Sequence, residues 1–330
     1  MTVFITGGAG YIGSHAVRIL NEKGYKTVVA DNLAEGHEES LDLNKTKFYR
    51  GDISDKIFLN KIFNENKIDG VLHFAAYLVV PESQREPYRY YKNNVGATLE
   101  LLEAMVENNI KHIVFSSSAA TYGIPKNIPV IETEEQKPIN TYGETKLAIE
   151  KMLTCFERAH DVKYIALRYF NVAGAYKTGE IGEAHNTEPH IIPIILQVAN
   201  GQREKFQICG DDYNTPDKTN IRDYVHVEDL INAHIKALEY LKRENRSDHF
   251  NLGSGGGYSN LEILNAARKI TGHPIPCEIT GRRPGDPDIL IASSKKAENI
   301  LGWGREYETI ESIIESAWKW HKSHPNGYNK

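Results

Sequence analysis

The chain has 330 residues, and its 39 basic and 44 acidic side chains give a formal net charge of −5 at pH 7. Apolar residues make up 40% and charged residues 25% of the sequence, which excludes wholesale disorder and a collagen-like or coiled-coil chain. The mild acidity argues against a general nucleic-acid binder, because such proteins usually carry a basic surplus. At about 150 residues per domain, the length predicts two domains.

The cysteines, the histidines and the N-terminus give no sign of metal, disulfides or export. Cys155, Cys209 and Cys277 are far apart, so reduced thiols are expected rather than a disulfide framework or a CxxC pair. The 13 histidines form no HExxH pattern, and the i+5 spacing of His185 and His190 is poor on a helix, so no metal site is predicted. No signal peptide is recognisable, and the apolar runs are too short to span a bilayer. We therefore expect a cytoplasmic protein without a membrane segment.

The first half of the chain alternates between strand-like and helix-like segments. Strands are expected at 3–6, 26–30, 47–50, 70–75, 112–116 and 163–169. Helices are expected at 11–23, from a Ser54 cap to about 66, at 87–108 and at 141–159. This alternation predicts an α/β fold in which helices cover both faces of a Rossmann-type, doubly wound parallel sheet.

The second half is less regular. Residues 174–188 read as a loop, and helices are expected at 191–200, 227–243, 260–271 and 309–321. Ser259 and Glu262 have capping-box spacing at the start of the third helix. Short strands are expected at 206–209, 249–252 and 276–279. We expect a Rossmann domain over 1–173 and a smaller α/β substrate-binding domain over 174–330, with room for the chain to cross back near 221–255.

A glycine-rich loop joins the first strand to the first helix. Its glycines at 7, 10 and 13 suit a tight turn, close approach of a pyrophosphate, and close packing of helix on strand. The N–H groups at the helix start then face the phosphates. Asp31 ends the second strand, where its carboxylate can accept hydrogen bonds from ribose hydroxyls and would repel a 2′-phosphate. Asp52 ends the third strand and could meet the adenine edge. The loop therefore predicts a dinucleotide site that favours NAD over NADP.

A second motif brings a phenol and an ammonium together. Tyr142 and Lys146 are four residues apart on a predicted helix, and a serine run at 116–118 ends the fifth strand. A phenol with a pKa near ~10 is a poor base at neutral pH. A neighbouring ammonium and a positive nicotinamide would lower that pKa. Tyr142 could then take a proton from a substrate hydroxyl while hydride leaves the same carbon, with a serine hydroxyl holding the oxygen.

Ordered motifs extend this pattern over essentially the whole chain. They are TGGAGYIGSH at 6–15, DNL at 31–33, GDI at 51–53, HFAA at 73–76, NNV at 93–95, SSSAATYG at 116–123, YGETK at 142–146, RYFNVAGA at 168–175, IRDYVHVEDL at 221–230, NLGSG at 251–255 and RRPGDP at 282–287. With them the sequence resembles the extended short-chain dehydrogenase/reductase family, within its nucleotide-sugar branch.

The resemblance implies an NAD-containing enzyme that interconverts UDP-galactose and UDP-glucose through a transient 4-keto sugar. Hydride would pass to bound NAD and return to the opposite face, with NAD retained as a prosthetic group. The implied catalytic residues are Ser118, Tyr142 and Lys146. The implied cofactor-binding residues are Gly7, Gly10, Tyr11, Ile12, Gly13, Asp31, Asn32, Asp52, Ile53, Phe74, Ala75, Ala76, Asn94, Ser116, Tyr142, Lys146 and Tyr169. The implied substrate-binding residues are Ser118, Tyr142, Asn171, His190, Arg222, Arg283, Asp286 and Leu290.

Some positions depart from the family pattern. Leu78 stands where many relatives carry a lysine near the cofactor, and Cys209 occupies a position near the expected uracil that is often phenylalanine in relatives. Leu290 aligns with the residue thought to gate bulk at the sugar 2-position. Because leucine is intermediate in size, UDP-N-acetylhexosamines also stay candidate substrates. The family's dimers pair the helices around 88–108 and 141–160, which implies a homodimer.

The sequence argues against three rival functions. A nucleotide-sugar 4,6-dehydratase needs an acidic pair after the active-site hydroxyl residue, whereas Ala119 and Ala120 follow Ser118 here. A decarboxylase needs a site for a glucuronate carboxylate, which nothing in the sequence singles out. A non-catalytic NAD sensor on the same fold could lose Tyr142 or Lys146 freely, yet both are present.

Overall fold

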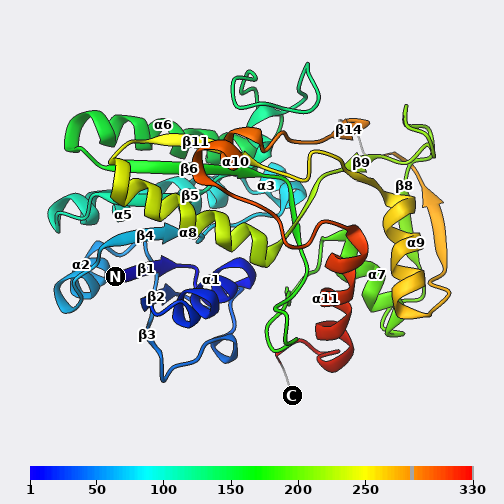
Figure 1. The fold of residues 1–330 in the computed structure, drawn as a ribbon, viewed down its shortest axis with the longest axis horizontal. Coiled ribbons are helices and arrows are strands. Elements are labelled where there is room, and N and C mark those ends of the chain that lie inside the picture. Colours follow the sequence, from blue (N-terminus) through cyan, green and yellow to red (C-terminus); the bar gives the residue numbers. More distant parts are fainter. Residues whose placement is uncertain (283–285, 329–330) are drawn as a thin grey trace.

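A seven-stranded parallel sheet forms the centre of the larger lobe (Figure 1). The computed structural model describes residues 1–282 and 286–328. The strands of the sheet are β1 (Thr2–Thr6), β2 (Lys26–Asp31), β3 (Thr46–Arg50), β4 (Gly70–His73), β5 (His112–Ser116), β6 (Lys163–Tyr169) and β11 (Asp248–Leu252). Their order is β11-β6-β5-β4-β1-β2-β3. The order reverses between β1 and β4, and the carboxyl edge beside such a reversal is where doubly wound sheets bind ligands.

Helices cover both faces of this sheet, and the alternation of β1 shows why. Val3 and Ile5 point into one buried cluster together with residues of α1 (Tyr11–Glu22) and α8 (Val227–Glu244). Phe4 points into the opposite cluster, which is completed by α2 (Lys56–Glu65), α5 (Ala97–Glu107) and α6 (Thr141–His160). Because successive strand side chains face opposite sides, one apolar strand supplies both layers of the core. The predicted Rossmann-type α/β fold is confirmed.

Two predicted helices differ in detail. The side chain that caps α2 is Asp55, which accepts hydrogen bonds from the N–H groups of Ile57 and Phe58, so the predicted Ser54 cap is wrong. The predicted long helix at 87–108 is divided into α4 (Pro87–Tyr90), a π-helical turn (Tyr91–Gly96) and α5. A short helix that the sequence did not predict, α3 (Val80–Arg85), precedes it.

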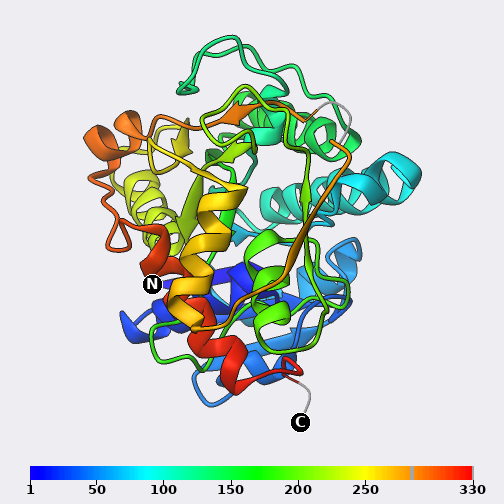
Figure 2. The same ribbon diagram turned by 90° about the vertical axis from the view of Figure 1, so that its right-hand side faces the viewer.

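The smaller lobe is built around three helices, α7 (Ile191–Ala199), α9 (Asn260–Thr271) and α11 (Ile310–Ser323), which share one apolar cluster. Figure 2 shows them together as the green, yellow and red helices. Beside them, β8 (Phe206–Cys209) pairs in parallel with β13 (Cys277–Thr280). The predicted capping box of α9 is confirmed, since Ser259 and Glu262 bond reciprocally to each other's backbone N–H groups.

The chain returns to the larger lobe after its first excursion. Helix α8 packs on β5 and β6, β11 pairs with β6, and α10 (Lys295–Leu301) packs on α8 and β11. Several short strands join the lobes: β7 (Asn171–Ala173), β9 (Ile221–Arg222), β10 (Tyr224–His226), β12 (Tyr258–Ser259) and β14 (Ile289–Leu290). Across the described parts of the chain, no helix combines the length and hydropathy that crossing a bilayer requires.

Candidate active site

The glycine turn between β1 and α1 is shaped by contacts that exclude side chains. Gly7 has φ +69°, and a Cβ there would lie 2.8 Å from the backbone nitrogen of Ala75. A Cβ on Gly13 would lie 2.0 Å from the Gly7 carbonyl oxygen. A Cβ on Gly10 would meet only that same oxygen, at 3.4 Å. Gly7 and Gly13 are therefore required by packing, whereas Gly10 leaves room for a ligand to approach the backbone.

The start of α1 suits an anion. Gly10 is the N-terminal cap, no side chain of the described residues caps this end, and the first turn holds no acidic residue. The N–H groups of Tyr11, Ile12 and Gly13 occupy this first turn, where the helix dipole favours negative charge. Tyr11 itself reaches across the lobes and donates its hydroxyl proton to the Gly174 carbonyl at 2.7 Å.

Two aspartates stand at the carboxyl ends of the neighbouring strands. The buried carboxylate of Asp31 accepts hydrogen bonds from the N–H groups of Ala9 (3.0 Å) and Leu33 (2.8 Å). Burial raises the pKa of Asp31, and those two donors oppose the rise. The Asp31 side chain thus ties the glycine turn to the loop after β2.

The second carboxylate, Asp52, accepts from the Asn32 side-chain amide at 3.0 Å and from the Ser54 N–H at 2.9 Å. These donors and the charge of Lys92 lower the pKa of Asp52, although partial burial opposes them. Ile53, next in the chain, is buried. The structure therefore places Asn32, Asp52 and Ile53 together beside the ends of β2 and β3.

The segment that follows β4 borders the glycine turn. Phe74, Ala75 and Ala76 leave the strand here, and the Phe74 ring lies 4.8 Å from the ring of His234 on α8. Tyr77 follows Ala76, and the Asn94 side chain bonds both of its backbone groups. Asn94 accepts from the Tyr77 N–H (2.9 Å) and donates to the Tyr77 carbonyl (3.0 Å). It also donates to the Thr145 hydroxyl at 3.2 Å. Asn94 thereby joins this segment to α6.

Ser118, Tyr142 and Lys146 come from the end of β5 and the start of α6. Lys146 is buried, donates to the Ser116 carbonyl at 2.7 Å, and lies 5.7 Å from the centre of the Tyr142 ring. The Ser118 hydroxyl oxygen accepts from the Ala120 N–H at 3.1 Å, so the hydroxyl can still act as a hydrogen-bond donor. The structure therefore brings the predicted trio to one edge of the sheet.

The electrostatics of this trio depend on burial. Burial raises the pKa of Tyr142 to about 12, and a hydrogen bond with Ser118 opposes the rise. Burial also lowers the pKa of Lys146 to about 7, and the charge of Glu150 opposes the fall. In the protein alone, Tyr142 therefore keeps its proton at neutral pH. A further positive charge beside the phenol is needed to make it a base.

A buried ion pair that the sequence analysis missed lies beneath Lys146. Glu150, one helical turn further along α6, accepts from Arg168 on β6 through both carboxylate oxygens, at 2.9 and 2.6 Å. Ser117 donates to the same carboxylate at 2.5 Å. Next to it, the hydroxyl groups of Ser116 and Tyr169 share a short hydrogen bond. The i+4 spacing of Lys146 and Glu150 is visible in the sequence, but no local spacing connects Glu150 to Arg168.

A polar cavity of about 450 Å³ opens in the smaller lobe. Its wall includes four of the predicted substrate residues: Asn171, His190, Arg222 and Asp286. The Arg222 guanidinium pairs with the Asp286 carboxylate and also donates to the carbonyls of Ile221 (2.7 Å) and Pro287 (2.8 Å). Asn171 donates to the Asp223 carbonyl at 2.9 Å. This wall offers a guanidinium and amide groups, which are suited to phosphate and to a polar base.

Other residues complete the description of this cavity. Cys209 lines it, and Leu290 lies opposite Arg222 in the pairing of β14 with β9. Predicted residue Arg283 lies outside the described residues. Asn220 also lines the cavity, and its buried side-chain oxygen Oδ1 has no hydrogen-bond partner among the described residues. Because a buried polar atom is costly unless it is paired, Asn220 marks a point where a ligand donor fits.

His190 enters the cavity wall with two carboxylates behind it. It precedes the first turn of α7, and its Nδ1 lies 2.8 Å from Glu183 and 2.9 Å from Glu188. Although burial opposes them, these two carboxylates raise the pKa of His190 to about 10. The sequence analysis named His190 but neither glutamate.

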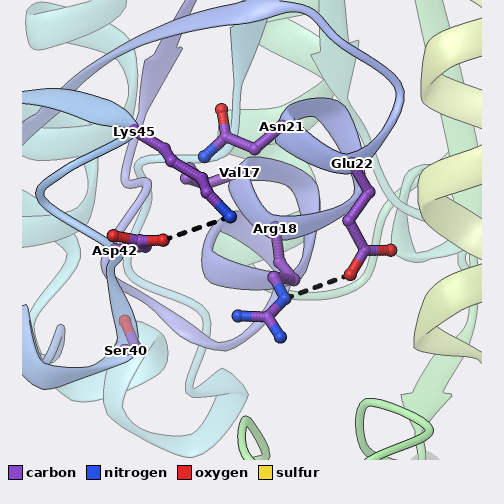
Figure 3. A pocket seen from close by; sticks show the side chains of 7 residues that line it. All are labelled: Val17, Arg18, Asn21, Glu22, Ser40, Asp42 and Lys45. Carbon is purple, nitrogen blue, oxygen red and sulfur yellow. Dashed lines mark hydrogen bonds and ion pairs between the residues drawn. The ribbon is translucent and has the colours of Figure 1, made fainter.

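A smaller hollow of about 80 Å³ lies beside α1 (Figure 3). Its lining includes none of the predicted site residues, and its charges already pair locally, Arg18 with Glu22 at 3.2 Å and Lys45 with Asp42 at 3.6 Å. This hollow therefore adds nothing to the candidate site.

A dinucleotide-type turn and a Ser–Tyr–Lys set at the carboxyl edge of a doubly wound sheet, together with a polar cavity in the smaller lobe, define an NAD-dependent enzyme of the Rossmann type. Residues 3–253 match the model of the NAD dependent epimerase/dehydratase family. The chain belongs to this family, and the prediction of an NAD-dependent enzyme is confirmed.

Individual relatives resemble almost the whole chain. It is 56% identical over 328 residues to the UDP-glucose 4-epimerase of Lacticaseibacillus casei, covering 99% of both proteins. A crystal structure of a UDP-glucose 4-epimerase superimposes with a TM-score of 0.98 at 52% identity and covers 100% of both chains. The Bifidobacterium longum enzyme, solved in complex with NAD+ and UDP, gives a TM-score of 0.93 at 39% identity over 99% of this chain and 100% of its own.

Proposed function

We propose that the protein is a UDP-hexose 4-epimerase that interconverts UDP-glucose and UDP-galactose. The observation that carries the proposal is that one chain holds a set of side chains suited to proton transfer and a second set suited to a diphosphate. Ser118, Tyr142 and Lys146 stand at the end of β5 and the start of α6, and Arg222 and Asp286 line the polar cavity of the smaller lobe. Relatives that share more than half of this sequence carry the name UDP-glucose 4-epimerase, which supports the same activity.

The residues around the glycine turn fit NAD. The first-turn N–H groups of α1 would receive the pyrophosphate, and Asp31 would accept from the ribose hydroxyls. Asn32, Asp52 and Ile53 would border the adenine, while Phe74, Ala75, Ala76 and Asn94 would border the other half of the dinucleotide. When bound, NAD supplies a hydride acceptor and donor for C4 of the sugar. We assign cofactor binding to residues 1–173, supported by their sheet, and UDP-sugar binding mainly to residues 174–330.

Tyr142 would remove the proton from the sugar 4-hydroxyl and return it to the 4-keto oxygen. The Ser118 hydroxyl would donate a hydrogen bond to that oxygen and hold it near the phenol. The protonated form of Lys146 would stabilise the phenolate, although burial lowers the pKa of Lys146 to about 7. Ser116 and Tyr169 would hold the floor of the site through the hydroxyl contact between them.

The UDP part would occupy the polar cavity. Arg222 would hold the diphosphate as a planar, multiply donating cation, with Arg283 assigned the same role. Asn171, Asn220 and His190 would supply polar contacts, and Asp286 would orient Arg222 through their ion pair. Leu290 would set the space available at the sugar 2-position.

The test uses purified protein without added cofactor. UDP-galactose and, separately, UDP-N-acetylgalactosamine are incubated with it, and the 4-epimers are resolved by NMR. We expect conversion of UDP-galactose. Conversion of UDP-N-acetylgalactosamine as well would extend the substrate range and show that Leu290 admits an N-acetyl group. Failure with UDP-galactose, even after NAD is supplied, would refute the proposed substrate.

We further propose that the protein is a homodimer that pairs the helical regions around 88–108 and 141–160. The outer side of the first region supports this, because Tyr88 is 77% and Leu99 43% exposed. Sedimentation equilibrium should give twice the chain mass of 37.2 kDa. A chain-mass monomer at micromolar concentration would contradict the dimer.

A further inference from the structure

A cluster of two glutamates and two histidines lies behind the cavity wall. One ligand atom from each of Glu183, His185, Glu188 and His190 lies within 4.8 Å of all the others. Both glutamates are buried. We propose that these four side chains bind one divalent transition-metal ion, for which Zn²⁺ is the best chemical match. This inference does not depend on the proposed substrate.

The local backbone explains why sequence spacing did not reveal the cluster. Residues 183–190 form no helix in the structure, so the poor i+5 spacing of the histidines has no bearing on their distance. Their ring centres are 5.2 Å apart. The four residues are interspersed with four others along an irregular loop, which brings all four side chains to the same side.

The distances suit a compact coordination centre. His185 Nε2 lies 3.0 Å from Glu183 Oε1, and His190 Nδ1 lies 2.8 Å from that oxygen and 2.9 Å from Glu188 Oε1. In a tetrahedral zinc site with bonds of about 2.0–2.1 Å, ligand atoms are roughly 3.3 Å apart. These contacts are within about 0.5 Å of that spacing, so small side-chain rotations can admit an ion.

The charges and donor types also match. Two carboxylates and two neutral imidazoles balance the charge of one divalent cation, and buried charges need such compensation. Imidazole nitrogen with carboxylate oxygen is a donor set that Zn²⁺ and its neighbours in the transition series accept. Without a cation, His185 and His190 both contact the same oxygen of Glu183, at 3.0 and 2.8 Å.

The position of the cluster indicates a structural role. His37, in the loop that follows β2, contacts the Ala184 carbonyl through Nε2 at 3.1 Å. Trp320 of α11 donates to the Glu183 carbonyl at 3.3 Å. His190 leads into α7 and lines the cavity. An ion held by four protein ligands would therefore tie the cofactor side to the wall of the polar cavity and fix the His190 ring.

The experiment measures metal binding directly. Protein stripped with a chelator is titrated with Co²⁺, whose visible absorption reports tetrahedral coordination, and then with competing Zn²⁺. We expect one equivalent to bind per chain, Zn²⁺ to displace Co²⁺, and the melting temperature of the stripped protein to rise on metal addition. His185→Ala should weaken binding at least about 10-fold, by analogy with losses at metal-supporting positions.

The matched control is His273→Ala, because His273 is exposed and outside the cluster. It should bind Co²⁺ like the wild type. If His185→Ala fails to fold, judged by circular dichroism and NAD content, the near-isosteric Glu188→Gln takes its place. A stoichiometry below about 0.1 equivalent at micromolar metal, or unchanged affinity in the folded variant, would overturn the proposal.

Discussion

The cofactor side and the substrate side of the site are built in opposite ways. Around the glycine turn the important groups are backbone atoms, held where Gly7 and Gly13 leave no room for a side chain. In the polar cavity the important groups are side chains, and each already has a protein partner, as Arg222 has in Asp286 and Asn171 in the Asp223 carbonyl. The glycine turn is a backbone cradle, and a short local motif encodes it. The cavity wall is instead assembled from β7, β9 and α7 and from other segments that are far apart in the chain.

This difference predicts how each side responds to mutation. Mutations in the glycine turn should impair folding and the retention of the cofactor. Mutations in the polar cavity should weaken the affinity for substrate and leave the fold intact. Mutations of Ser118, Tyr142 or Lys146 should affect the chemical step alone.

The largest effect on turnover is expected for a mutation of Tyr142. Tyr142→Phe removes the proton-transfer group while keeping the ring that packs near Lys146. Turnover should fall by about 10³-fold, within the usual range for loss of an acid–base group, with the circular dichroism spectrum and bound NAD unchanged. Tyr25→Phe is the control and should keep full activity, because Tyr25 precedes β2 at the opposite edge of the sheet and its hydroxyl bonds Glu239. Full activity in Tyr142→Phe would contradict the proposed proton transfer by this residue.

A glycine pair tests the backbone cradle. Gly13→Ala would place a Cβ 2.0 Å from the Gly7 carbonyl oxygen, so we expect poor folding and loss of NAD. Gly10→Ala meets the same oxygen only at 3.4 Å, so its melting temperature should stay near that of the wild type while NAD retention falls. The measurements are thermal melting and the absorbance of NAD released on denaturation. Equal behaviour of the two variants would contradict the distinct roles assigned to these glycines.

The pH dependence of stability tests the burial of Lys146. Its pKa is lowered to about 7 by burial in the folded protein, whereas an unfolded lysine titrates near 10.4. Between these values the unfolded chain binds more protons, so the lysine's destabilising contribution is complete below pH 7 and is relieved as pH rises. From pH 7 to pH 9, the cofactor-free wild type should gain roughly 2 kcal/mol relative to Lys146→Met.

Urea unfolding at the two pH values measures this difference. Glu150 and Tyr142 face the ammonium, but neither changes its charge between pH 7 and pH 9, because the pKa of Glu150 is lowered and that of Tyr142 is raised to about 12. A constant difference between wild type and variant would show that Lys146 titrates as an exposed lysine.

The smallest expected effect belongs to the cavity. Arg222→Lys keeps the positive charge but loses the planar set of donors that bonds Asp286, Ile221 and Pro287 together. We expect KM for UDP-galactose to rise about 10-fold, equivalent to about 1.4 kcal/mol, with kcat changed less. Steady-state kinetics separate the two parameters. A fall in kcat with KM unchanged would place Arg222 in the chemical step instead of in substrate binding.

Much of the larger lobe could be predicted from the sequence. The bounds of β5 and β6 agree with the predicted 112–116 and 163–169, because these runs are apolar and bounded by turn residues. The strands β7, β9, β10, β12 and β14 were missed because segments of two or three residues have no periodicity. Their formation depends on tertiary pairing, as when Tyr224 of β10 pairs with Asn171 of β7.

The site shows the same division. Gly7, Gly10, Gly13, Tyr142 and Lys146 were predictable because one turn and one helical spacing place them. The acids behind His190 were missed, because only an irregular loop brings Glu183 and Glu188 to that ring. Likewise the pairing of Glu150 with Arg168 joins α6 to β6 and leaves no local pattern. The cavity residues that were predicted came from family resemblance, which carries tertiary information that spacing lacks.

The isotope found at C4 of the product distinguishes hydride return within the site from exchange with solvent. Purified protein is incubated with UDP-galactose in D₂O, and the UDP-glucose formed is examined by proton NMR. The account predicts full protium at C4, because hydride leaves and returns within the site while Tyr142 exchanges only the hydroxyl proton. Deuterium at C4 would mean that solvent supplies this hydrogen, and it would contradict the proposed epimerisation through a 4-keto sugar.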